Sequence, residues 1–160
     1  MRPGGVQVSA LDHRIPPPLV GLACGLLAWL LARASPGLGV DWLPRVPVAA
    51  ALVALGLSLD VWGLVAFRRA RTTLNPLSPE RTSAVVQGGP YRFTRNPMYL
   101  GMACVLLGAC AWLANPLALL AVFVFVGYIT CFQIMPEERA LLGKFGGAYA
   151  DYLRRVRRWL

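Results

Sequence analysis

Four long apolar stretches limit what this chain can fold into more than any other feature. They cover residues 19–33, 46–67, 97–113 and 116–135. About 20 helical residues cross a hydrocarbon layer of about 30 Å, so the second and fourth stretches are long enough, while the first and third would have to stand nearly upright. The chain is 57% apolar and only 14% charged, whereas soluble domains carry about 25% charged residues. We therefore expect an all-α integral membrane protein with four transmembrane helices.

Basic residues are distributed unevenly between the two sides of these predicted spans. The net charge is +9, and if the N-terminus is cytoplasmic only Arg33 and Arg45 of the 16 basic residues lie outside. Such an excess is typical of cytoplasmic loops, and a basic stripe interleaved with aromatic residues, which would suggest nucleic-acid binding, is missing. The loop between the second and third spans and the C-terminal tail are expected to face the cytoplasm. Fifteen arginines against one lysine indicate a GC-rich bacterial genome, and hence a bacterial inner membrane.

The N-terminal region allows two interpretations. Residues 1–18 are rich in proline and glycine, which predicts a flexible arm before a single membrane domain, 19–160. Alternatively, Arg14, the first apolar stretch and the small residues 32–34 fit a cleaved secretory signal, which would leave three spans. Cys24, Cys104, Cys110 and Cys131 lie within spans without metal-type spacing, and His13 lies in the arm, so no metal site is expected.

The last two spans and the tail have clear local signals. Asn115-Pro116 predicts a tight turn, which would make the last two spans an antiparallel hairpin. A helix is expected to begin at Pro136 and to kink at Gly146-Gly147. Its apolar residues recur every three or four positions, which predicts an amphipathic cytoplasmic helix. These residues are Leu141, Phe145, Tyr149, Tyr152, Val156 and Trp159.

The segment GGPYRFTRNPMYLG, residues 88–101, is the strongest candidate for chemistry. Asn96 and Pro97 suit the cap and first turn of a helix, whose free N–H groups would attract a carboxylate. Arg92 and Arg95 would add charge-assisted hydrogen bonds to the same anion. The alternative is that both arginines bind lipid phosphates and fix the topology.

A second candidate lies where the fourth span ends, at Glu137 and Glu138. A carboxylate there would accept ribose hydroxyls or an ammonium group and would attract a cationic sulfonium. Neighbouring helical positions diverge by about 100°, so one of the two is expected to enter a given pocket. The alternative is a solvated first turn that complements the helix dipole.

Together, GPYRFTRNPMYLG, the apolar hairpin and PEERALLGKFGGAYADYLRRVRRWL resemble the isoprenylcysteine carboxyl methyltransferase family and its bacterial relatives. The resemblance covers residues 85–160, with a weaker echo at 71–76. Phospholipid N-methyltransferases are similar in the same places. The resemblance implies that residues 85–160 bind S-adenosylmethionine, with Arg95 and Arg92 orienting an anion. The implied pocket residues are Gly89, Pro90, Tyr91, Asn96, Pro97, Tyr99, Gly101, Glu137 and Glu138.

Two of these positions have an expected role toward the cofactor, and a third differs from the residue that many family members have. Tyr91 and Tyr99 would face the sulfonium as cation-π partners, unless they only anchor the chain at the membrane interface. Many family members have histidine where this chain has Asn96, and an amide cannot exchange a proton near neutral pH. Acid-base chemistry is therefore excluded at that position.

The resemblance implies a membrane methyltransferase whose substrate has an apolar part and enters from the bilayer. Carboxyl O-methylation of an isoprenylcysteine-type or isoprenoid acid is the leading prediction. Phospholipid N-methylation and S-methylation of a hydrophobic thiol are the alternatives. A noncatalytic membrane scaffold and a membrane reductase are more remote. Membrane lipids are the expected surroundings, and no nucleic acid or metal is expected to bind.

Overall fold

The computed structural model describes residues 15–70 and 85–160, and these residues form an all-helical structure, as predicted. Within them there is no strand, and the one isolated bridge joins Thr94 to Arg157. The predicted arm, 1–18, and the echo at 71–76 lie mostly or wholly outside the described residues. The α-helices are α1 (Pro17–Ala34), α2 (Arg45–Arg69), α3 (Pro97–Leu113), α4 (Leu120–Ile129), α5 (Met135–Phe145) and α6 (Gly147–Arg155).

Three helical segments are long and apolar enough to cross a membrane: Pro17–Ala34, Arg45–Arg69 and Pro116–Phe145. The helix Pro97–Leu113, counted as a span from the sequence, is apolar but shorter. Large apolar side chains such as Leu22, Val61 and Phe123 are exposed on these segments, and together with the length and composition of the segments they identify a membrane protein. A water-exposed surface of this kind would be unfavourable.

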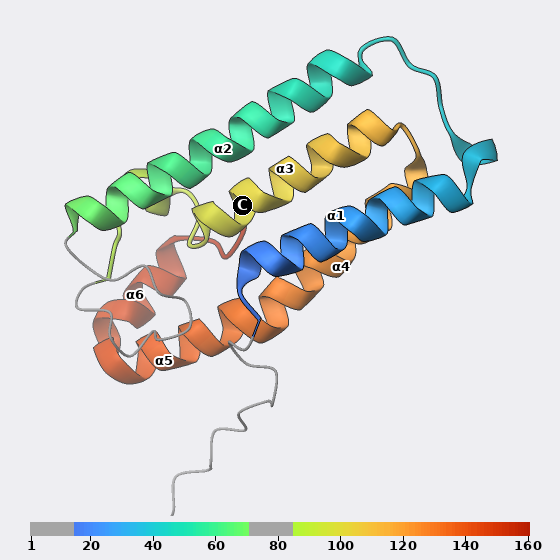
Figure 1. Cartoon of the computed structure of the whole chain (residues 1–160). Helices are drawn as coiled ribbons and strands as arrows, with labels where there is room; N and C mark the ends of the chain where they lie inside the picture. Colours follow the sequence, from blue (N-terminus) through green and yellow to red (C-terminus); the bar gives the residue numbers. More distant parts are fainter. Residues whose placement is uncertain (1–14, 71–84) are drawn as a thin grey trace, which may run out of the picture.

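The core lies between α1, α3 and α4, and α2 packs on the far side of α3 (Figure 1). Phe125 and Ile129 of α4 and Ala28 of α1 are fully buried in it. Because α1 contributes core residues, cleavage after residue 34 would remove part of the packing. The end of α2, the start of α3, α5 and α6 all lie at one end of this bundle (Figure 1).

Small residues let α2 and α3 approach backbone to backbone. A Cβ added at Gly56 would lie 2.5 Å from the carbonyl oxygen of Gly101, and one added at Gly108 would lie 2.9 Å from that of Ala49. Such seams are typical of membrane helices, where close van der Waals packing replaces the hydrophobic effect. The seam fixes α3, and with it the loop that precedes α3.

The turn before α4 is built by Asn115, as its sequence suggested. The Asn115 Oδ1 accepts a hydrogen bond from Leu117 N at 3.0 Å, and Nδ2 donates to the carbonyl oxygen of Ser35 at 2.8 Å. Ala114 precedes it in the left-handed conformation, with φ of 51°. The turn is thereby tied to the end of α1.

The tail differs from the sequence prediction in two places. No separate helix starts at Pro136, because α4 continues through a π-helical turn, Thr130–Ile134, directly into α5. The predicted kink is confirmed at Gly146, whose φ of 54° suits glycine and separates α5 from α6. Helix α6 stops at Arg155, and Val156 is extended, so the prediction that the helical face reaches Trp159 is wrong.

Candidate active site

The loop before α3 folds around Gly89 and Tyr91. Gly89 has φ of 60°, and a Cβ there would lie 3.2 Å from the indole nitrogen of Trp62, so glycine meets both a backbone and a space requirement. Pro90 and Tyr91 are buried in a short 3₁₀ turn, Gly89–Arg92. The Tyr91 ring contacts Phe67 of α2 edge-on, with centroids 5.3 Å apart. These contacts seat the loop on α2.

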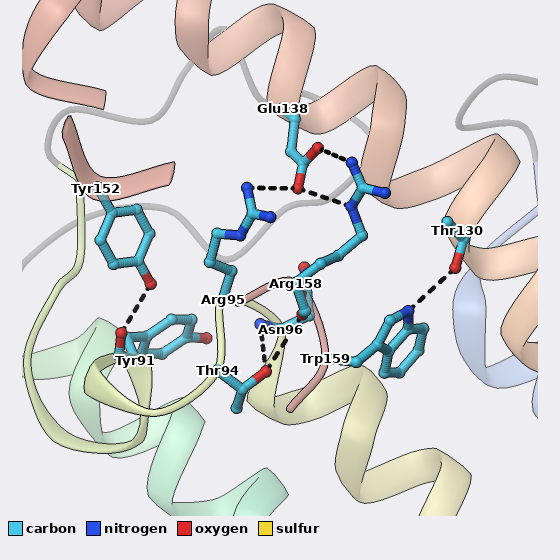
Figure 2. A network of polar contacts seen from close by, with 9 residues as sticks. All are labelled: Tyr91, Thr94, Arg95, Asn96, Thr130, Glu138, Tyr152, Arg158 and Trp159. Atoms are coloured by element: carbon cyan, nitrogen blue, oxygen red, sulfur yellow. Dashed lines mark hydrogen bonds and ion pairs between the residues drawn. The ribbon is translucent and has the colours of Figure 1, made fainter. Parts of the chain in front are cut away.

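The C-terminal tail holds the same loop from the other side. The Tyr152 hydroxyl donates to the carbonyl oxygen of Tyr91 at 2.8 Å (Figure 2). Arg95 N donates to the carbonyl oxygen of Arg157 at 2.9 Å. Burial raises the pKa of Tyr152 well above its usual range, which keeps the hydroxyl protonated as a donor. Residues about 60 positions apart are thus joined into one site.

Asn96 precedes α3 as predicted, but its side chain does not cap the helix. Its Nδ2 instead donates to the carbonyl oxygen of Arg158 at 2.9 Å, and its N–H donates to Thr94 Oγ1 at 3.2 Å (Figure 2). The capping prediction is therefore wrong, because the tail offers an acceptor that the local sequence does not reveal. Pro97 follows at the first helical position, as predicted, and it is buried.

Glu137 lies against α3. Its Oε1 accepts a hydrogen bond from the Tyr99 hydroxyl at 2.7 Å, and Tyr99 itself is buried. This contact brings together one residue from each of the two predicted motifs. Both a carboxylate and a phenol, each with further hydrogen-bonding capacity, are available on this side of α3.

Glu138 lies between two arginines. Its Oε1 is 3.0 Å from Arg95 Nη1, while the Arg158 guanidinium donates to Oε1 from Nε at 3.1 Å and to Oε2 from Nη2 at 2.6 Å (Figure 2). The side chains of Glu138 and Arg95 are each only 13% exposed. Two guanidinium groups facing one carboxylate leave an excess of one positive charge in a largely enclosed place.

The Arg95 Nε is buried without a hydrogen-bond partner among the described residues. An unpaired buried donor is costly in a folded protein, and it is often the place where a ligand contributes the missing acceptor. Arg95 is thus suited to bind an anion.

The other predicted residues divide into two groups. Arg92 is exposed and does not join the Arg95 cluster. Gly101 faces away from Tyr99, toward Gly56 and the Asp60 carboxylate of α2, so the close approach that it permits in this structure is between helices. The two glutamates diverge as expected, but both turn inward, to different partners.

Sequence reasoning missed Arg158, Tyr152 and Asp60. Arg158 was counted only as one charge in a basic tail, and nothing local indicates that its pKa is raised by a hydrogen bond to Glu138. Asp60 did carry a signal, because a single carboxylate within an apolar stretch is seldom incidental. Its Oδ1 is buried without a hydrogen-bond partner among the described residues.

Comparison with known proteins places this geometry in context. The sequence model of a family described as "Phospholipid methyltransferase" matches residues 44–148. Over 63 residues, 39% of this chain, the sequence is 48% identical to the full length of an uncharacterized protein of Haemophilus influenzae. Over 105 residues, 66% of this chain, it is 30% identical to Protein-S-isoprenylcysteine O-methyltransferase B of Arabidopsis thaliana, of which the chain spans about half, 53%. No solved structure matches.

Proposed function

This chain belongs to the phospholipid methyltransferase family, and on that premise we propose that it transfers the methyl group of S-adenosylmethionine to a lipophilic acceptor in the membrane. The family is one of methyltransferases, so the chain is expected to be an enzyme that uses a methyl donor. The donor in the bound state supplies an activated methyl group on a cationic sulfur. The Arabidopsis relative, also a methyltransferase by its name, supports the same reaction type.

The residues of the candidate site fit such a donor. S-adenosylmethionine carries a carboxylate, an ammonium group, a sulfonium and ribose hydroxyls. The excess positive charge of Arg95 and Arg158 over Glu138 suits the carboxylate, and Glu137 with Tyr99 suits the cationic groups or the hydroxyls. Burial raises the pKa of Tyr91 in the Gly89-Pro90-Tyr91 turn well above its usual range, and nearby Tyr152 and Glu137 raise it further. These contacts support the proposed cofactor pocket.

Methyl transfer of this kind is a direct displacement. The acceptor atom would form a bond to the methyl carbon while the carbon–sulfur bond breaks and its electron pair goes to sulfur. The protein then contributes alignment and exclusion of water. Glu138 and Arg158 would hold Arg95 in place, and Arg95 would orient an anion of the donor or of the acceptor. Arg92, being exposed, would assist only a ligand that reaches the surface.

A carboxylate is the acceptor that we propose first, in an isoprenylcysteine-type or isoprenoid acid. A carboxylate needs no general base, which suits a site where Asn96 occupies the position of the family's histidine. The name of the Arabidopsis relative supports this acceptor. The name of the matching family supports a second, the amine of a phospholipid. A hydrophobic thiol is a third, and the comparisons lend no support to the scaffold or reductase alternatives.

We further propose four spans, with α3 crossing as the shortest, and a site on the cytoplasmic side of a bacterial inner membrane. Helix α3 has 17 residues, which corresponds to about 26 Å at about 1.5 Å per residue. The described basic residues support this orientation. Arg68, Arg69, Arg92 and Arg95 belong to the end that holds the site, while Arg33 and Arg45 belong to the other end.

Replacing Arg95 tests the site directly. Arg95→Ala is expected to weaken S-adenosylmethionine binding, or to raise the KM for the acceptor, by about tenfold or more. The reason is that a charge-assisted hydrogen bond contributes about 1.5–3 kcal/mol. Isothermal titration with the donor and a methyl-transfer assay in lipid vesicles would measure the two effects. The matched control is Arg45→Ala, an exposed arginine paired with Asp41 at the other end of the molecule. Unchanged donor affinity and unchanged transfer in Arg95→Ala would remove Arg95 from the site.

A further inference from the structure

The last five residues, 156–160, form a non-helical segment that we call the C-terminal strap. Three consecutive strap residues contact three different parts of the molecule. The Arg157 carbonyl oxygen accepts from Arg95 N at 2.9 Å, and the Trp159 indole donates to Thr130 Oγ1 in the π-helical turn at 3.1 Å (Figure 2). Arg158, between them, makes the contacts that matter most for the site.

Arg158 joins the two halves of the candidate site through different atoms. Its guanidinium binds both oxygens of Glu138. Its carbonyl oxygen accepts from Asn96 Nδ2 at 2.9 Å and from Thr94 Oγ1 at 3.3 Å, both in the loop before α3. Arg158 thus links Glu138 of α5 to the loop before α3.

The positive charge that this cluster can offer to an anion depends on how Arg95 and Arg158 share the Glu138 carboxylate. Arg158 uses two nitrogens and reaches both carboxylate oxygens, whereas Arg95 contacts only Oε1 through Nη1 and keeps its Nε unpaired. Without Arg158, the Glu138 carboxylate, 13% exposed, would have Arg95 as its remaining arginine partner. It would then neutralise the charge that the site has available for an anion, since a largely enclosed carboxylate needs a counter-charge.

We propose that Arg158 is a positioning residue of the methyl-transfer site. Its guanidinium binds Glu138 so that the positive charge of Arg95 stays available to the anionic group of a ligand. The same contact holds the Arg158 carbonyl oxygen against the loop, so that loss of the guanidinium loosens the loop. The effect on donor binding rests on the proposed function. The fixing of the loop does not, and it can be measured without any ligand.

The test compares Arg158→Gln with Arg158→Lys and with Arg154→Gln, an exposed control in α6 whose arginine pairs with Asp151. Arg158→Gln is expected to weaken S-adenosylmethionine binding about tenfold or more and to raise the KM for the donor more than it lowers kcat. Arg158→Lys should recover part of the loss, since an ammonium keeps the charge but not the bidentate geometry. Arg154→Gln should leave binding unchanged.

Hydrogen exchange of the ligand-free full chain in detergent is the second readout. The Arg95 and Asn96 amides are expected to exchange faster in Arg158→Gln than in wild type, and at the wild-type rate in Arg154→Gln. Thermal unfolding of each variant shows whether it is folded. If Arg158→Gln is not folded, Arg158→Lys takes its place in both measurements.

Three results would decide against the proposal or against its premise. Donor affinity in Arg158→Gln that matches Arg154→Gln overturns the positioning role. Unchanged exchange at Arg95 and Asn96 overturns the fixing of the loop. A folded wild-type protein that does not bind S-adenosylmethionine overturns the proposed function instead, and the exchange measurement then still tests the strap.

Discussion

Tyr99 and Tyr128 differ in what their hydroxyl groups contact. The Tyr99 hydroxyl donates to Glu137 at 2.7 Å, whereas the Tyr128 hydroxyl is buried without a hydrogen-bond partner among the described residues. A buried donor that is satisfied stabilises the fold, and removing its partner leaves the other group unpaired. Variants of these two tyrosines therefore separate the contribution of the Tyr99–Glu137 hydrogen bond to stability from that of a tyrosine ring in a helix.

Tyr99→Phe is expected to lower the free energy of unfolding by about 1–3 kcal/mol, because Glu137 Oε1 loses its donor in a buried place. Tyr128→Phe should change it little or raise it slightly, since no hydrogen bond is lost. Thermal or denaturant unfolding in the same detergent would compare them. Equal losses in the two variants would mean that the Tyr99 contact contributes no stability.

At this scale the sequence named residues that the structure brings together, but it did not predict how they pair. Gly89, Pro90, Tyr91, Tyr99 and the two glutamates were identified from motif and residue type. The partner of Glu138 was not, because Arg158 lies 20 positions away in a tail where every arginine looks alike. Hydrogen bonds between segments distant in sequence leave no local pattern.

The elements are arranged by one close contact, that of α2 with α3. In the sequence, the family resemblance placed Gly101 among the residues of the cofactor pocket. In the structure, a Cβ at Gly101 would meet the Asp60 carboxylate and would lie 2.6 Å from the carbonyl oxygen of Gly56. The Gly56 carbonyl oxygen cannot move easily, because it belongs to the helix backbone. The glycine was recognisable as special, but the object that approaches it depends on which helix packs there.

Gly101→Ala is expected to lower the free energy of unfolding by about 1–3 kcal/mol, the usual cost of overpacking a tight contact. Gly127→Ala is the matched control, since a Cβ there has no atom within 4 Å and alanine is the better helix former. Unfolding in detergent, with tryptophan fluorescence, would measure both. A Gly101→Ala variant as stable as wild type would contradict the packing of α2 on α3 as described.

Helix boundaries show a similar division between what is local and what is not. The start of α3 at Pro97 and the break at Gly146 follow from proline and glycine themselves and were predicted. The end of α6 at Arg155 was not, because the apolar spacing continues to Trp159. The strap is not helical, and its residues form hydrogen bonds with the loop before α3 instead. The loop residues come close to the strap only in the tertiary structure, so the local sequence does not reveal these bonds.

In the whole molecule, the end of α2, the start of α3, α5 and α6 lie together at one end of a helical bundle (Figure 1). We propose that the polar residues of these segments bind a methyl donor. Membrane insertion follows from composition and was predictable from the apolar stretches alone. The methyltransferase family follows from the motifs and from the match over residues 44–148. The identity of the acceptor depends on a pocket shape that no short motif encodes.

The most direct measurement is therefore titration of the purified full chain, in lipid vesicles, with S-adenosylmethionine. We predict saturable binding that the demethylated product S-adenosylhomocysteine displaces, together with weaker binding in Arg95→Ala. A folded protein that binds neither compound, and binds a nicotinamide cofactor in their place, would contradict the account.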